Sequence, residues 1–226
     1  LYDNSFGSQI GDLHYAYDPN GNRTAEWGSY ARLTIPQAFG PAQYNADNAL
    51  VSNGTTSYSY DQNGNLASDG TNTYSWNARN QLMGITGGST ASFAYDPFGR
   101  RGQSTINGTT TGYVYDGWNV AQELQGDNPT VNYLLGIGLD QRYSRTDSGG
   151  TQSYLTDALG STIALANTDD SVPTSYTYDP FGQATTTGAS STNPYQYTGE
   201  ATDGDGLQYN RARYYSPSTC LLYTSP

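Results

Sequence analysis

The sequence predicts an all-β protein built as an array of antiparallel β-hairpins, and three observations support this. A short motif, Tyr-x-Tyr-Asp followed by a turn, recurs along the chain. The chain has 22 tyrosines, which are good strand formers, and its 27 glycines and 10 prolines punctuate it at short intervals. No apolar run with the period of a helix stands out. A recurring unit indicates a repeat architecture rather than a single catalytic site.

The repeat is clearest in two copies that end in Asp-Pro-Phe-Gly, at 93–99 and 176–182. Looser copies stand at 15–21 and 58–64, degenerate ones at 74–77 and 113–117, and weaker ones at 44–48 and 154–160. The residues that define the motif, and that form its candidate structural site, are Tyr17, Asp18, Gly21, Tyr60, Asp61, Gly64, Tyr95, Asp96, Pro97, Gly99, Tyr115, Asp116, Tyr178, Asp179, Pro180 and Gly182.

Each Tyr-x-Tyr segment is expected to be a strand. Its two rings are two residues apart, so they project from one face, and the residue between them projects from the other. Ala16, Ser59, Val114 and Thr177 hold this middle position. Stacked hairpins would then bury a continuous face of tyrosine rings. Because Leu, Ile, Val and Phe supply only 32 of the 226 residues, tyrosine has to provide much of the core.

Each strand is expected to lead into a tight turn. Asp-Pro-Phe-Gly fits a type I turn, because Asp suits the first position, proline sets the backbone at the second and glycine suits the fourth. In the copies with Asn-Gly, at 20–21 and 63–64, a two-residue hairpin turn is the competing assignment. These two copies also look like calcium loops, but the glycine comes too early, and Ser29 and Asn72 replace the bidentate acid. Turn capping is therefore favoured over a metal site.

The composition argues against several classes of function. The chain has 9 arginines, no lysine, 20 acidic residues and a net charge of −11, which opposes binding to nucleic acid or to an anionic membrane surface. No apolar stretch is long enough to span a bilayer. The single cysteine and the single histidine, His14, argue against a disulfide framework and a zinc site. We therefore expect no cofactor, no metal and no serine triad.

The repeats resemble the YD repeats of RHS (rearrangement hot-spot) proteins and of their relatives, the Tc-toxin C subunits, wall-associated toxins and teneurins. The resemblance covers roughly residues 12–219, and Tyr154–Ser161, which reads YLTDALGS, is similar to the segment that precedes the RHS-associated core domain. The end of the chain resembles the opening signature of that core domain, NPY-x-(F/Y)-T-G-E followed by GL-x-Y-x-RARYY-(D/S)-P. The matching residues include Pro194, Tyr195, Gly199, Gly206, Leu207, Tyr209, Arg211, Arg213, Tyr214, Tyr215 and Pro217.

The resemblance implies a β-strand ribbon that spirals into a hollow shell around a C-terminal toxic segment. It implies repeats over 1–190 and the start of the core domain over 191–219. The expected function is that of a structural shell fragment of a secreted bacterial polymorphic toxin, secreted or on the cell surface. Its expected partners are the upstream repeats and cargo of its own parent polypeptide, and a secretion apparatus.

Two other functions remain open. One is a cell-surface module that binds glycans through exposed aromatics, for which Trp27 is the best candidate, while Trp76 and Trp118 are expected in cross-strand ladders. The other is an autoproteolytic core. The family's catalytic aspartates would lie beyond Pro217, and neither Asp169–Asp170 nor Asp203 with Asp205 stands in a protease motif, so the chain itself is not expected to be an enzyme.

Two further expectations concern the signature. Arg211 and Arg213 are expected to share one strand face with Leu207, Tyr209 and Tyr215 and to pair with carboxylates. Residues 220–226 break the family pattern. One reading of their codons matches a transposon-end adapter used in sequencing libraries, so we hypothesise that they are a non-native tail; the alternative is a divergent native tail. Because the chain opens with Leu1 inside the repeats, we also expect it to be a piece of a longer protein.

Overall fold

The computed structural model describes residues 1–3, 7–31 and 40–223. In these ranges every regular element is a strand except η1 (Tyr197–Gly199), a three-residue 3₁₀ turn, so the all-β prediction is confirmed. The described residues contain no helix long and apolar enough to cross a membrane. The chain divides into two compact units, unit 1 from 1–35 with 132–200, and unit 2 from 36–131 with 201–226.

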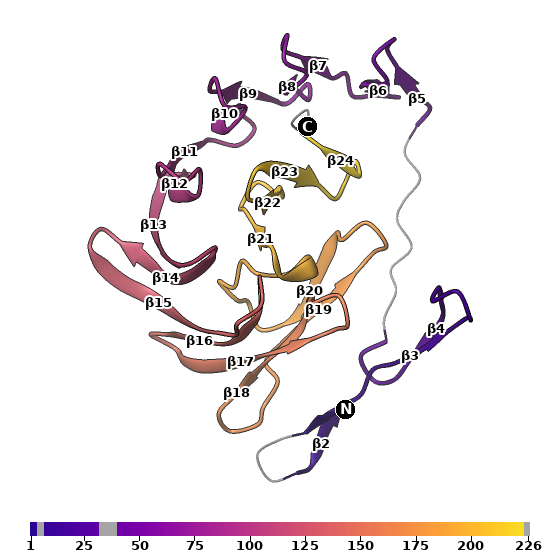
Figure 1. Cartoon of the computed structure of the whole chain (residues 1–226), viewed down its shortest axis with the longest axis vertical. Coiled ribbons are helices and arrows are strands. Elements are labelled where there is room, and N and C mark those ends of the chain that lie inside the picture. The colour runs from indigo at the N-terminus through magenta and orange to yellow at the C-terminus, as the bar shows by residue number, and fades with distance from the viewer. Residues whose placement is uncertain (4–6, 32–39, 224–226) are drawn as a thin grey trace. The chain divides into compact units, whose positions relative to one another are not determined.

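Fourteen strands form one antiparallel sheet in which they are ordered as in the sequence, from β7 to β20 (Figure 1). These strands are β7 (Ser59–Tyr60), β8 (Leu66–Ser68), β9 (Asn72–Trp76), β10 (Leu82–Gly87), β11 (Ala91–Tyr95), β12 (Arg101–Ile106), β13 (Thr109–Asp116), β14 (Asn119–Gln125), β15 (Asn128–Leu135), β16 (Arg142–Asp147), β17 (Gly150–Thr156), β18 (Thr162–Asn167), β19 (Thr174–Tyr178) and β20 (Ala184–Gly188).

The remaining strands form smaller sheets. Unit 1 contains the pairs β1 (Tyr2–Asp3) with β2 (Gln9–Gly11) and β3 (His14–Tyr17) with β4 (Arg23–Trp27). Unit 2 contains β5 (Ala42–Tyr44) with β6 (Leu50–Asn53), and a four-stranded sheet of β21 (Ala201–Thr202), β22 (Gln208–Asn210), β23 (Arg213–Ser216) and β24 (Leu221–Leu222).

The Asp of each repeat organises its turn. The Asp96 carbonyl accepts a bond from Gly99 N at 2.9 Å, and its Oδ1 accepts bonds from Phe98 N and Arg100 N, each at 2.9 Å. Gly99 has φ +84°, and the pairing of β11 with β12 shifts register beside Tyr95. This is a turn followed by a left-handed residue and a bulge. The same bonds recur at Asp18, Asn45, Asp61, Asn77, Asp157 and Asp179.

The Asn-Gly copies use this same turn. A two-residue hairpin centred on Asn20 or Asn63 would give that asparagine a positive φ, and neither has one. The type I prediction is therefore confirmed over its competitor. Asp116 is different: it pairs directly with Asn119, so Gly117 and Trp118 alone connect β13 to β14.

The first aromatic is buried in five repeats, at Tyr58, Tyr74, Phe93, Tyr154 and Tyr176, and half-buried at Tyr15 and Tyr113. Phe93 is 3% exposed and Tyr176 is 4% exposed. Ser59, Ser75 and Ala94 are exposed, as the alternation of a strand requires. The predicted tyrosine face is thus real: Tyr58, Tyr74 and Phe93 belong to the core cluster of unit 2, and Tyr154 and Tyr176 are buried in unit 1.

In five repeats the second aromatic donates a hydrogen bond to a backbone carbonyl of an earlier strand. Tyr95 OH donates to the Leu82 carbonyl at 2.8 Å, and Trp76 Nε1 donates to the Leu66 carbonyl at 2.7 Å. Each acceptor is the fifth residue after the Asp or Asn of the preceding repeat. The other members of this ladder are Tyr60 with Leu50, Tyr115 with Arg101, and Tyr178 with Thr162. The phenol thus satisfies a carbonyl beside the bulge while its ring stays in the core.

In unit 2 the four-stranded sheet β21–β24 packs on the tyrosine face. Leu207, Tyr209 and Tyr214 share one core cluster with Tyr74 and Phe93. The last described residues of the chain join it, because Leu66 N donates to the Tyr223 carbonyl at 2.8 Å and the Tyr223 ring meets Tyr74 edge-on at 5.3 Å. Cys220 is exposed. Within the hypothesised tail, Leu221–Tyr223 therefore pack as part of the fold, and 224–226 lie outside the described residues.

The expected shared strand face of Arg211 and Arg213 is wrong. Arg211 has φ +56° and lies in the turn between β22 and β23, whereas Arg213 is the first residue of β23. Asn210 pairs with Arg213, and the buried residues of this hairpin are Tyr209 and Tyr214. Arg213 is exposed and has no carboxylate partner among the described residues.

Candidate functional site

The signature segment, residues 191–217, folds back onto strands of both units. Its first part, 191–200, belongs to unit 1, and its second part, 201–217, belongs to unit 2. Buried arginines of the 14-stranded sheet contact it in both units: Arg142 and Arg145 of β16 in unit 1, and Arg101 of β12 in unit 2. These arginines define two docking clusters.

The cluster in unit 2 is built around the Arg101 guanidinium. Its Nη1 lies 2.5 Å from Asp203 Oδ2, and the two side chains are only 3% and 4% exposed. Nη1 also donates to Tyr214 OH at 3.3 Å, and the Tyr209 ring lies 4.2 Å from Cζ. Arg101 N donates to Tyr209 OH at 3.1 Å. One arginine thus binds a carboxylate, a phenol and an aromatic face of the signature.

Asp205 lies in the same turn as Asp203. Gly206 N donates to the Asp203 carbonyl at 2.9 Å, and Leu207 N donates to Asp205 Oδ1 at 3.0 Å. Asp205 Oδ2 is buried and has no partner among the described residues. Burial, with the nearby Asp203 carboxylate as a second cause, raises the pKa of Asp205 to about 6. The ion pair between Arg101 and Asp203 holds this turn against β12. Asp205 is the weakly acidic carboxyl group of the same turn.

The cluster in unit 1 holds the Asn-Pro-Tyr part of the signature. Tyr154 OH donates to Asn193 Oδ1 at 2.7 Å, and Thr162 Oγ1 donates to the Tyr195 carbonyl at 2.8 Å. Arg142 Cζ lies 3.4 Å from the centroid of the Tyr195 ring. Arg145 Nη2 donates to Thr192 Oγ1 at 2.9 Å. Tyr195 is 4% exposed, so this half of the signature is also a core element.

Sequence reasoning did not single out the three buried arginines. A signal was present, because Arg101 stands at the fifth position after Asp96, where other repeats have Leu66 or Leu82. A charge at a position that is apolar elsewhere in a repeat indicates a specific partner. Among the signature residues, Tyr195, Leu207, Tyr209 and Tyr214 are buried, and Gly199 is buried in η1.

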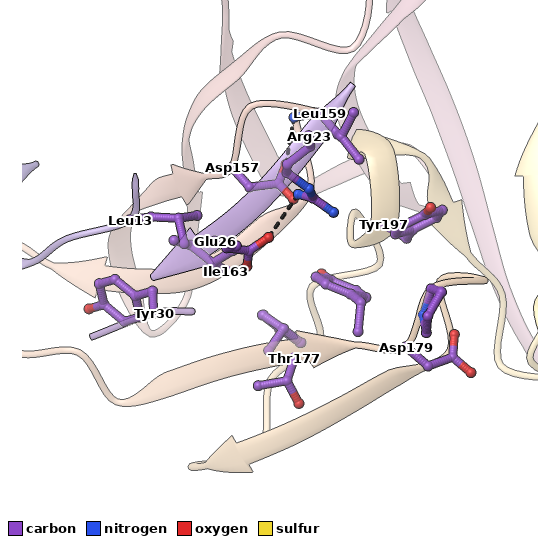
Figure 2. Close-up of a pocket in the computed structure, with 13 residues that line it drawn as sticks. Leu13, Arg23, Glu26, Tyr30, Asp157, Leu159, Ile163, Thr177, Asp179 and Tyr197 are labelled. Carbon is purple, nitrogen blue, oxygen red and sulfur yellow. Dashed lines mark hydrogen bonds and ion pairs between the residues drawn. The ribbon is translucent and has the colours of Figure 1, made fainter. Parts of the chain in front are cut away.

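A cavity of about 90 Å³ lies in unit 1 between β3–β4 and the turns that follow β17 and β19 (Figure 2). Arg23 Nη1 lies 2.7 Å from Glu26 Oε2, and Figure 2 shows this ion pair beside Asp157. Tyr176, whose hydroxyl is buried without a described partner, also lines the cavity. The volume is well below the roughly 300 Å³ at which small-molecule pockets begin, and suits a few waters. Among the described residues, no three His, Cys, Asp or Glu side chains are grouped to hold a metal ion.

The three tryptophans differ in their surroundings. Trp76 is tied to Leu66 in the ladder, as expected. Trp118 is 55% exposed, and its expected place in a cross-strand ladder is wrong, because it lies in the two-residue turn between β13 and β14 rather than on a strand. Trp27 is 50% exposed and stacks on His14 at 5.5 Å with an interplanar angle of 12°.

Known proteins with similar sequences show which family this architecture belongs to. The family model described as teneurin YD-shell matches residues 7–203. The chain is 37% identical over 220 residues to the tRNA3(Ser)-specific nuclease WapA of Bacillus spizizenii and to the tRNA nuclease WapA of Bacillus subtilis. Each match covers 91% of this chain and 9% of the relative, so the chain spans about a tenth of the length of these proteins.

Solved structures agree on the fold. The complexes TcdB2-TccC3-Cdc42 and TcdB2-TccC3 match with TM-scores of 0.65 and 0.64, each at 17% identity. The matches cover 98% and 99% of this chain and 16% of each solved chain. The resemblance to YD repeats is confirmed by the family model and by these folds, and the chain belongs to the teneurin YD-shell family.

Proposed function

We propose that this chain is a wall segment of a YD shell in a secreted bacterial toxin, and that the shell encloses a C-terminal toxic segment of the same polypeptide. The relatives that share 37% of its residues are named as nucleases and are far longer than this chain. The observation that carries the proposal is the docking of the signature segment on the tyrosine face. The chain that follows the last strand of the 14-stranded sheet is held by buried arginines rather than left in solvent.

In this role the residues of the docking clusters act as anchors. Arg101 with Asp203, and Arg142 with Tyr195, fix the signature to strands β12 and β16. A signature fixed in this way gives any chain that continues from it a defined starting point. The wall keeps the C-terminal toxic segment of the same polypeptide, its cargo, away from solvent and proteases. We propose the same secreted or cell-surface location as for the family's toxins.

Limited proteolysis of the parent polypeptide, expressed from its source gene, tests the proposal. We expect its C-terminal segment to resist protease in buffer and to be cut within minutes once urea unfolds the shell. Arg101→Met should speed its digestion, whereas Arg79→Met, at an exposed turn, should not. Equal digestion rates with and without urea would overturn the proposal. The same gels report whether the parent cleaves itself before protease is added.

A further inference from the structure

The turns of the 14-stranded sheet lie along two opposite rims. Because its antiparallel strands follow one another in sequence order, the turns after odd-numbered strands, from β7 to β19, form one rim, which we call the odd rim. The turns after even-numbered strands form the even rim. Among the described residues, every large apolar side chain that is exposed in these turns belongs to the odd rim: Phe98, Trp118, Ile137, Leu139, Leu159 and Phe181. Apolar side chains gathered on one side of a sheet indicate a surface that binds another element.

In unit 1 the odd rim already contacts an earlier hairpin of the chain, β3–β4. Ala158 N, in the turn after β17, donates to Tyr15 OH at 3.4 Å, and Tyr2 OH donates to the Thr156 carbonyl at 2.7 Å. Leu159, from the same turn, lines the cavity of about 90 Å³ that lies between the rim and this hairpin (Figure 2). The two hydrogen bonds join residues that are 143 and 154 positions apart in the sequence. A Tyr-x-Tyr hairpin therefore packs on the turn of a much later repeat.

In unit 2 the odd rim presents a built apolar surface to solvent. Phe98 is 76% exposed and Trp118 is 55% exposed. Arg100 ties their two turns together, because its Nε donates to Asp96 Oδ2 at 2.7 Å and its Nη1 donates to the Gly117 carbonyl at 2.5 Å. Its Cζ also lies 5.2 Å from the centroid of the Phe98 ring. The two rings thus stand on turns that are fixed to each other.

We propose that the Phe98–Trp118 surface binds Tyr-x-Tyr hairpins of repeats that precede this chain in the parent polypeptide, as β3–β4 binds the turn after β17. The sequence separation identifies the partner, since a step of 143 to 154 residues back from Phe98 or Trp118 falls before Leu1. Such hairpins carry exposed rings, as Tyr17 does here at 56%, and aromatic rings pack well on an aromatic rim. This partner exists only if the chain is one segment of a longer wall, so the proposal rests on the function proposed above.

Hydroxyl-radical footprinting of this chain and of the parent polypeptide tests the contact. We expect Phe98 and Trp118 to be oxidised severalfold more slowly in the parent polypeptide, because the upstream hairpins cover them. Val114, which is 40% exposed on β13 and lies outside the turns, is the control and should react equally in both. Equal oxidation of the two rings in both proteins, or protection that extends to Val114, would overturn the proposal. A C-terminal segment that resists protease beside reactive rings would reject this contact and leave the proposed function standing.

The contact within unit 1 supplies a second test that needs only this chain. Leu159→Asp should speed amide hydrogen exchange in β3 and β4 severalfold, because it adds a negative charge to a cavity that Glu26 and Asp157 already line. Ile137→Asp adds the same charge to the odd rim at a fully exposed residue outside that lining, and should leave this exchange unchanged. If Leu159→Asp exchanged like the unsubstituted chain, β3–β4 would not depend on the rim, and the proposal would fail with it.

Discussion

At Arg101 the chain places a positive charge where water hardly reaches, and Asp203 is its only ion-pair partner among the described residues. A buried pair of this kind contributes little net stability over an apolar pair of similar shape, but removing one partner leaves the other charge uncompensated. The ion pair therefore specifies which segment docks here more than it adds to stability. A single pair of side chains thus joins two segments that are far apart in the sequence.

Arg101→Met should destabilise the protein by about 3–5 kcal/mol, because Asp203 would remain buried without its partner. The double variant Arg101→Met with Asp203→Leu should recover much of that loss, because both charges are then gone. Urea denaturation followed by tyrosine fluorescence measures both. Arg79→Met, at an exposed turn, is the matched control and should lie within about 0.5 kcal/mol of the parent chain. A double variant no more stable than the single one would contradict this account.

Asp205 should make stability depend on pH. Its pKa of about 6 in the folded chain lies above the ordinary value, so the folded state holds a proton that the unfolded state releases. The contribution to stability is complete below pH ~4 and is lost as the pH rises through ~6, by about 3 kcal/mol.

Asp205→Asn isolates this effect from the other carboxylates. The variant should match the parent chain at pH 4 and exceed its stability by about 3 kcal/mol at pH 8, because the amide never ionises. Urea unfolding at a series of pH values gives the difference between the two chains. A difference that does not change with pH would show that Asp205 titrates as an ordinary carboxyl group.

At the scale of the element, the hairpin could be predicted from the sequence because its causes are local. The Asp that caps its own turn, the glycine that follows and the alternation of buried and exposed residues all lie within seven residues, and the structure confirms each at Asp96. The ladder of phenols and carbonyls could not be predicted. It joins Leu82 to Tyr95, which lies beside the register shift of β11 against β12, and no short-range pattern specifies that contact.

The left-handed position of the turn gives an element-scale prediction. It is filled by glycine at Gly99 and Gly160 but by asparagine at Asn48 and Asn80, with φ of +58° and +56° at the asparagines. Gly99→Ala should cost about 1–2 kcal/mol, because a Cβ is strained at positive φ. Gly99→Asn should cost markedly less.

Thermal unfolding of both Gly99 variants measures this difference. The site suits the experiment because an added Cβ would meet only the end of the Gln81 side chain, at 3.4 Å. Gly182→Ala serves as the contrasting case, because its Cβ would lie 2.3 Å from the Tyr197 ring and the loss should be larger. If alanine and asparagine were equally tolerated at Gly99, the backbone argument would fail.

At the scale of the molecule, the sequence predicted a tyrosine-lined array but not the arginines that bind the returning segment. Arg142 reaches Gly199 and Arg145 reaches Thr192 through contacts that only the folded chain brings together. The pattern around Arg211 and Arg213 indicated one strand, because Leu207, Tyr209, Arg211, Arg213 and Tyr215 alternate without a break. The left-handed turn at Arg211 interrupts that alternation, and Arg211 is not a glycine, so the sequence gives no signal of a turn there.

The outer strands of the 14-stranded sheet lead to the last prediction. β20 is the terminal strand of the sheet, and its residues after Ala184 are exposed and uncharged. An uncharged edge strand pairs readily with another chain. We therefore expect this chain to associate as its concentration rises, and Thr185→Lys with Thr187→Lys to suppress that association through charge at the edge. Ser148→Lys with Thr168→Lys changes the net charge equally at exposed turn positions and should not suppress it. Sedimentation velocity over a hundredfold concentration range measures all three chains; a parent chain that stays monomeric, or equal suppression by both variants, would exclude β20 as the contact.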